Sequence, residues 1–305
     1  MSFNEGVRID PGRASRGRGG GRGGGRGGGR GLAIGGGGGL VVLLLAVVFG
    51  VPLDGLLGAT DPAADVGGEG ALTGGFEHCL TGADANEHVD CRIIATAESL
   101  DVVWEEQLPI GGGPSYEPPG LTIFEGQVAT GCGTATSAVG PFYCPADETT
   151  YFDVGFFDVL RERFGAGEGP LAEQFVVAHE FGHHVEHQLG LLAEARRDPQ
   201  GAASGAVRVE LMADCLAGVW AHHATTAIDP ESGQTFLQPL TAQDIADALS
   251  AAAAVGDDRI QEQLQGQVTP ETFSHGTSEQ RQSWFTRGYE GGRLDGCDTF
   301  GTDSL

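Results

Sequence analysis

The residues best suited to chemistry form the stretch His179-Glu180-Phe181-Gly182-His183, which has the pattern H-E-x-x-H. It falls in a run, residues 171–192, whose composition predicts a helix. Residues four positions apart share one helix face, so His179 and His183 can direct two imidazoles at one metal ion. Glu180 lies beside them and can reach a water at that ion. Two nitrogens, a third ligand and a water make an open tetrahedral zinc site suited to hydrolysis.

A pair of histidines four positions apart can also belong to a solvated helix face, and this segment has further histidines at His184 and His187. The apolar residues 175–178, just before His179, favour a buried helix instead. An unpaired polar cluster would be costly in that setting, and a bound metal ion removes the cost. We therefore expect one zinc ion per chain.

A third ligand is predicted in the run 208–215, which contains Glu210 and Asp214 four positions apart. Glu210 follows His183 by 27 positions (210 − 183), enough for a loop and an antiparallel return helix. Glu210 can complete a His-His-Glu set, and Asp214 can accept the free N–H of a ligating imidazole. The alternative is an ordinary charged helix face, but the apolar neighbours of both residues leave little polar surface.

Together these motifs resemble the bacterial neutral zinc metallopeptidase family, whose members are membrane-anchored proteins of the gluzincin type. The motifs read H-E-F-G-H-H-V from residue 179 and E-L-M-A-D-C-L-A-G-V-W-A-H-H from residue 210. Further segments that match the family pattern are residues 131–147, 252–259, 273–281 and 297–300. The resemblance covers roughly residues 92–300 and is specific because several motifs occur in order. It implies a zincin-like α+β fold.

The resemblance also implies a mechanism for hydrolysis of a peptide or protein substrate. Zinc held by His179, His183 and Glu210 would activate water, and Glu180 would accept its proton and deliver it to the leaving amine. A later histidine or tyrosine stabilises the oxyanion in related gluzincins, which makes His275 the candidate. The alternative is that His275 only bonds backbone in a tight turn.

Two tyrosines and a strand are secondary candidates for the same site. Tyr143 and Tyr151 are weaker choices than the histidine for the oxyanion donor. Residues 151–154 are expected to form a short strand just before the zinc helix. The resemblance implies that such an edge strand pairs with an extended substrate.

The N-terminal part predicts attachment to a membrane. Residues 1–31 form an arm rich in arginine and glycine, and residues 32–57 can supply the length of a spanning helix. A cleavable signal peptide is the rival interpretation, but no small-x-small site stands out after the apolar stretch. Seven arginines precede this stretch and none lies in the linker that follows, which predicts a cytoplasmic N-terminus and an extracytoplasmic domain.

The arm and the domain carry different charges, and we therefore expect them to bind different partners. Of 17 basic and 42 acidic residues, seven and two lie in the arm, which leaves 10 and 40 beyond it. Such an acidic domain is not expected to bind nucleic acid. The arm is expected to contact anionic lipid, and RNA binding through its Arg-Gly repeats is an alternative function.

All six cysteines lie after the apolar stretch, which favours an oxidising compartment. Six cysteines allow 15 pairings. Proximity favours the pairing that consists of Cys79–Cys91, Cys132–Cys144 and Cys215–Cys297. Zinc binding by thiolates is disfavoured because the chain has no C-x-x-C pair.

The predicted organisation is an arm, an anchor, a flexible linker at 58–78, one domain at 79–300 and a tail at 301–305. The domain is expected to be α+β, with a small sheet packed on a mainly helical body. Helices are predicted at 93–107, 241–254 and 279–290 besides the two zinc helices, and strands at 121–125 and 151–154. An alternative function for such a domain is a catalytically silent zinc-binding scaffold in the envelope, although an intact Glu180 has no use there.

Overall fold

The structure is a computed structural model, and it describes residues 2–17 and 75–305. The predicted anchor at 32–57 and the predicted linker up to residue 74 lie outside the described residues. Within the described part, no helix is both long enough and apolar enough to cross a membrane.

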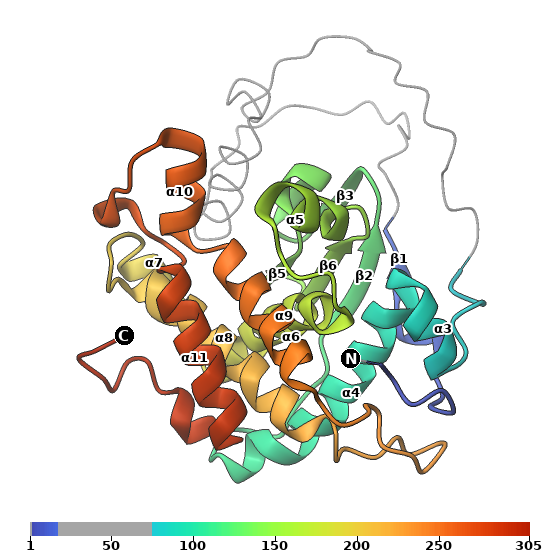
Figure 1. The fold of residues 1–305 in the computed structure, drawn as a ribbon. Coiled ribbons are helices and arrows are strands. Elements are labelled where there is room, and N and C mark those ends of the chain that lie inside the picture. The colour runs from blue at the N-terminus through green and yellow to red at the C-terminus, as the bar shows by residue number, and fades with distance from the viewer. Residues whose placement is uncertain (1, 18–74) are drawn as a thin grey trace, which may run out of the picture.

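Most of the described chain forms a body of helices around a shared core (Figure 1). The helices are α3 (Gly82–Glu87), α4 (Val89–Ile110), α5 (Phe156–Phe164), α6 (Pro170–Gln188), α7 (Leu192–Arg197), α8 (Gly205–His223), α9 (Ala242–Ala254), α10 (Asp257–Gln265) and α11 (Ser278–Gly291). Helices α6 and α8 carry the two sequence motifs and are buried along most of their length. They pack against each other. Helix α9 packs against α6, and α11 packs against α8.

Local sequence signals explain where several helices begin. Pro170 starts α6, where its fixed φ suits a helix and its missing N–H costs nothing. Helices α9 and α11 each begin at a capping box, in which Thr241 pairs with Asp244 and Thr277 pairs with Gln280. In each case the threonine stands three positions before its partner, a spacing that the sequence itself shows.

Close helix contacts depend on glycine. A Cβ at Gly288 in α11 would lie 1.9 Å from the carbonyl oxygen of Cys215 in α8. A Cβ at Gly182 in α6 would lie 3.0 Å from both Cα and the carbonyl oxygen of Ala213 in α8. Both neighbours are backbone and cannot turn aside. Glycine therefore lets α8 lie between α6 and α11 at short distance.

The sheet has four strands in the order β1 (Ser15–Arg16), β2 (Gly120–Phe124), β6 (Thr149–Asp153) and β5 (Phe142–Cys144). The first three run parallel to their neighbours, and β5 pairs antiparallel with β6, with Phe142 opposite Tyr151. A separate hairpin joins β3 (Gln127–Thr130) to β4 (Gly133–Thr136). Short 3-10 turns complete the described chain: η1 (Pro11–Arg13), η2 (Ser137–Val139), η3 (Pro270–Thr272) and η4 (Leu294–Cys297). The predicted α+β architecture, a small sheet on a mainly helical body, is confirmed.

The N-terminal segment is part of this domain. Phe3, Val7 and Ile9 are buried in the main core, and β1 adds a strand to the sheet. The domain therefore includes residues 2–17, and the prediction of a separate arm is wrong for them. The seven arginines of residues 1–31 predicted a solvated arm. The buried side chains of Phe3, Val7 and Ile9 instead decide how the described part of it packs.

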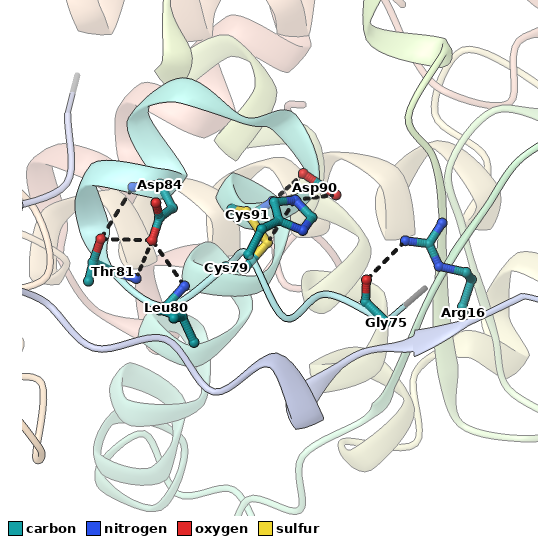
Figure 2. Close-up of a disulfide and its surroundings, with 9 residues drawn as sticks. Arg16, Gly75, Cys79, Leu80, Thr81, Asp84, Asp90 and Cys91 are labelled. Atoms are coloured by element: carbon teal, nitrogen blue, oxygen red, sulfur yellow. Dashed lines mark hydrogen bonds and ion pairs between the residues drawn. A yellow bond between two sulfur atoms is a disulfide. The ribbon is translucent and has the colours of Figure 1, made fainter. Parts of the chain in front are cut away.

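The packing of this segment also bears on the predicted topology. Residues 17 and 75 flank the part outside the description, and the Arg16 guanidinium donates to the Gly75 carbonyl oxygen at 3.4 Å (Figure 2). Arg16 also lies over the Phe76 ring, with 4.7 Å between its guanidinium carbon and the ring centroid. A membrane between the N-terminus and the domain would separate groups that touch here. The predicted placement of the two on opposite sides conflicts with this contact.

All three predicted disulfides are present. Cys79–Cys91 and Cys132–Cys144 each close 12 residues, and Cys215–Cys297 spans 82 residues. The last of these ties α8 to the turn after α11, so it holds one of the two motif helices to the C-terminal part of the domain.

Candidate metal centre

Helix α6 directs two imidazoles at one point. His179 and His183 lie one turn apart, with 4.7 Å between their ring centroids. The Nε2 atom of His179 is 3.3 Å from Oε2 of Glu210, and the Nε2 atom of His183 is 3.6 Å from Oε1 of the same carboxylate. The ligand atoms of all three residues lie within 4.8 Å of one another. The structure thus brings the three predicted ligands together.

Helix α8 supplies Glu210 because it can approach α6 closely. The contact between Gly182 and Ala213 sits between the two ends of the motif, so the facing side chains of α8 reach the histidines. Asp214 follows Glu210 by one helical turn and lies on the same face, as its contact with His179 shows.

His179 is oriented by a pair of groups from two other helices. Its Nδ1 lies 2.9 Å from Oδ1 of Asp214, which leaves Nε2 free to bind a metal. Arg281 of α11 donates to both oxygens of Asp214, at 2.8 Å from Nε and from the terminal nitrogen. Asp214 was predicted for this role, whereas Arg281 was assigned none.

His183 is oriented by a residue of its own helix. Its Nδ1 lies 2.8 Å from Oε2 of Glu186, which is fully buried. Sequence reasoning missed Glu186, although a glutamate three positions after a ligating histidine lies on the same helix face. Burial raises the pKa of Glu186 well above its ordinary value.

His275 precedes α11 and lies close enough to Glu210 for the two to interact electrostatically. Its Nδ1 lies 3.2 Å from Oδ1 of Asp257, and Asp257 Oδ2 accepts backbone N–H groups of residues 274, 275 and 276. The imidazole is therefore held by a side chain, which argues against the alternative of a purely backbone contact. Burial opposes its protonation, but the negative charges of Glu210 and Asp257 raise the pKa of His275. Asp257 was not singled out in the sequence.

The two tyrosine candidates are engaged elsewhere. The Tyr143 hydroxyl lies 2.6 Å from Nδ1 of His187 and 3.0 Å from Nδ1 of His184, so the two further histidines of the motif helix hold this tyrosine. The Tyr151 hydroxyl donates to Asp147 at 2.7 Å. His275 is left as the better candidate for a donor at the centre.

The predicted edge strand is in the interior of the sheet. The strand at 149–153, β6, pairs with β2 on one side and β5 on the other. The edge position belongs to β5, which also packs against α6. The prediction that residues 151–154 offer a free edge is therefore wrong, because residues 142–144 pair with them and occupy that edge.

Buried negative charge at the centre fits a divalent cation. Four carboxyl groups are each no more than 8% exposed: those of Glu180, Glu186, Glu210 and Asp214. The guanidinium of Arg281 pairs with one of them, Asp214. Burial alone would lower the pKa of His179, yet Asp214 raises it to about 10. The carboxylates of Asp214 and Glu210 thus favour positive charge at this position. Two imidazole nitrogens and a carboxylate are zinc ligands, so the donor set fits zinc.

Glu180 is placed beside this donor set. Its side chain is buried on α6, next in sequence to His179, and burial raises its pKa. Charge on the two histidines opposes that rise. A carboxylate with a raised pKa is a stronger base, which suits proton transfer near neutral pH.

Comparison with known proteins relates the chain to one family model and to uncharacterized bacterial proteins. Residues 3–300 match the family model described as "Putative neutral zinc metallopeptidase". The uncharacterized protein Rv2575 of Mycobacterium tuberculosis strain H37Rv is 54% identical over 233 residues, which are 76% of this chain and 78% of the relative. The uncharacterized protein YpfJ of Escherichia coli strain K12 is 39% identical over 272 residues, 88% and 87% of the two chains. No solved structure matches the chain.

Proposed function

This chain belongs to the neutral zinc metallopeptidase family, and on that premise we propose that it hydrolyses peptide bonds with one zinc ion per chain. The observation that carries the proposal is the convergence of His179, His183 and Glu210 from two buried helices. Glu180 is buried on the same helix and interacts electrostatically with both histidines. A structural zinc site would need a fourth protein ligand and no base. Three ligands and an adjacent carboxylate are the arrangement of a catalytic site.

Each residue of the site would have a distinct role in the hydrolysis of a peptide bond. Zinc held by His179, His183 and Glu210 supplies Lewis acidity, which makes water a nucleophile near neutral pH. Glu180 accepts the proton of the attacking water and passes it to the leaving amine. His275, held by Asp257, donates a hydrogen bond to the oxyanion that develops at the scissile carbonyl. Asp214 keeps His179 in the tautomer that leaves Nε2 free.

An extended substrate would lie along β5. This strand has an unpaired side within the described sheet and packs against the motif helix α6. Backbone pairing with an edge strand recognises a peptide without demanding particular side chains. Specificity would then come from side chains that neighbour this strand.

The proposed location is an oxidising compartment outside the cytoplasm, with attachment to a membrane through residues 32–57. Three disulfides among the described residues support the oxidising compartment. Membrane lipid is the proposed partner of the arginine-rich and apolar stretches, which lie outside the described residues. The acidic domain is not proposed to bind nucleic acid.

The test compares zinc content and peptide cleavage in wild type, Glu180→Gln and Glu194→Gln. Glu194 lies on α7, forms a contact with Arg197 and serves as the matched control. We expect one zinc per chain in all three proteins, cleavage of a peptide library by wild type and the control, and at least a thousandfold loss in Glu180→Gln. Such a loss is the order expected when a general base is removed. Cleavage by Glu180→Gln would refute the mechanism, and a zinc-loaded wild type without cleavage would favour the silent scaffold.

A further inference from the structure

A second group of metal-ligating side chains surrounds the disulfide Cys79–Cys91, at the N-terminal end of α4 (Figure 2). Nε2 of His78 lies 3.1 Å from Oδ2 of Asp90 and 3.5 Å from Sγ of Cys79. One ligand atom from each of the four residues lies within 4.8 Å of the other three. In the oxidised protein the two sulfurs are bonded to each other, and the imidazole and carboxylate lie beside them in contact with each other.

This environment distinguishes Cys79–Cys91 from the other two disulfides. Within residues 2–17 and 75–305, groups of three or more ligand side chains gather only at the proposed catalytic centre and here. Neither Cys132–Cys144 nor Cys215–Cys297 has such neighbours. A disulfide that only fastens the chain needs no imidazole and carboxylate at its sulfurs, so the arrangement calls for another explanation.

The spacing of the ligand atoms is that of a tetrahedral zinc site. Bond lengths of about 2.3 Å to sulfur and 2.0–2.1 Å to nitrogen or oxygen place neighbouring ligand atoms roughly 3.3–3.8 Å apart. The distances from His78 to Asp90 and to Cys79, 3.1 and 3.5 Å, are already close to these values. The two sulfurs, bonded at 1.98 Å in the oxidised protein, must separate, and they can do so once that bond is broken.

Access to the site is available from one side. The His78 side chain is 47% exposed and the Asp90 side chain 16%, while both sulfurs are buried. The ring of His88 packs edge-on against His78, with 5.4 Å between centroids, and limits its rotation. A metal ion can therefore enter beside His78 and reach the sulfurs below it.

We propose that His78, Cys79, Asp90 and Cys91 form a second, redox-gated site for zinc or a similar thiophilic divalent metal. A dithiol or phosphine reductant supplies two electrons, the S–S bond breaks, and the two sulfurs take up two protons. Binding of the metal displaces those two protons and leaves two thiolates, one imidazole and one carboxylate as ligands. A disulfide oxidant that accepts two electrons from the two thiolates re-forms the S–S bond, is itself reduced to two thiols, and releases the metal ion. The segment before α3 therefore stays fastened to α4 in both states.

Cobalt(II) is the probe for this site, because thiolate ligation gives a charge-transfer absorbance in the near ultraviolet. The proposed catalytic site has no sulfur ligand, so its cobalt cannot produce that band. We expect no band in the oxidised full chain, and a band at one equivalent of thiolate-bound cobalt after reduction by a phosphine without denaturant. Absence of the band after complete reduction of Cys79–Cys91, verified by thiol labelling and mass mapping, would overturn the proposal.

Three variants separate this site from unspecific binding to free thiols. His78→Ala and Asp90→Asn should each weaken the reduced-state affinity for cobalt at least tenfold, while the disulfide still forms on oxidation. Cys132→Ser/Cys144→Ser is the matched control and should keep the band at wild-type affinity. A band that is insensitive to both His78→Ala and Asp90→Asn, or one lost in the control, would show that other thiols bind the metal. These readouts are independent of peptide cleavage.

Discussion

The two histidines of the H-E-x-x-H motif are oriented by carboxylates of opposite character. Asp214 reaches His179 from α8 and is held by Arg281 of α11 through two hydrogen bonds of 2.8 Å. Glu186 reaches His183 from the same helix, and its second oxygen, Oε1, has no hydrogen-bond partner among the residues that the structure describes. One carboxylate thus joins three helices, whereas the other is local to α6.

The difference indicates which of the two carboxylates contributes more to stability and to metal affinity. A buried carboxylate paired with a guanidinium stays charged, and the loss of either partner leaves an uncompensated charge. A buried carboxylate without a cation tends to hold a proton instead, as the raised pKa of Glu186 indicates. We therefore expect Asp214 and Arg281 to matter far more than Glu186, and the predictions below test that ranking.

Both histidines lie on α6, so both carboxylate contacts depend on the position of this helix. The N-terminal segment helps to hold α6 in place. Arg13 lies 5.9 Å from the centroid of Phe181, on the motif helix, and forms an ion pair with Asp101. Deletion of residues 2–17 removes this contact and the buried side chains of Phe3, Val7 and Ile9. At about 1.5–3 kcal/mol for each buried side chain, we expect a loss of roughly 5 kcal/mol or more in urea unfolding. Arg8→Ala, an exposed control, should change the free energy of unfolding by less than about 0.5 kcal/mol.

Arg281→Met tests the charged side of the comparison. The substitution leaves Asp214 buried without its cation, and we expect a loss of about 3–5 kcal/mol in the free energy of unfolding of the metal-free protein. Arg287→Met on the same helix is the control, because Arg287 is exposed and only lies over the Trp284 ring. Equal losses in the two variants would mean that the pair with Asp214 has no special weight.

Asp214→Asn tests the link from this pair to the metal. The amide cannot accept from His179 as strongly and leaves Arg281 without a counter-charge. We expect zinc affinity, measured by competition with a chelator, to fall about 10–100-fold. A fall of less than threefold in folded protein would show that His179 needs no carboxylate behind it.

Glu186→Gln should have the smallest effect on zinc, with affinity reduced by less than about tenfold, because the amide oxygen can still accept from His183. A loss as large as that of Asp214→Asn would end the distinction between the two carboxylates. The pH dependence of the metal-free protein gives a second readout. Burial raises the folded pKa of Glu186 above its ordinary 4.5, so its stabilising contribution is present below that value and is lost as pH rises through the folded pKa. As pH rises above the ordinary pKa of 4.5, the variant should therefore lose less stability than wild type.

The parts of the site that share a helix were accessible from the sequence. Spacing of four predicted His179 with His183 and Glu210 with Asp214, because helix periodicity alone decides which side chains share a face. Glu186 was readable by the same rule and was overlooked. Arg281 and Asp257 were not readable, because each meets its partner through contacts between segments far apart in the chain.

The sequence by itself predicted five helices of the body, two capping boxes, the three disulfide pairs and the three side chains that meet at the candidate metal centre. Helix periodicity, short spacings and motif order carried most of these predictions. Helices α3, α5, α7 and α10 were not predicted. Tertiary structure decided which strand lies at the edge of the sheet and that residues 2–17 belong to the domain. The physical reason is that periodicity assigns a side chain to a face, while the surface that this face meets depends on long-range packing. Gly182 illustrates both: its position in the motif is plain in the sequence, but its purpose appears only where α6 meets Ala213.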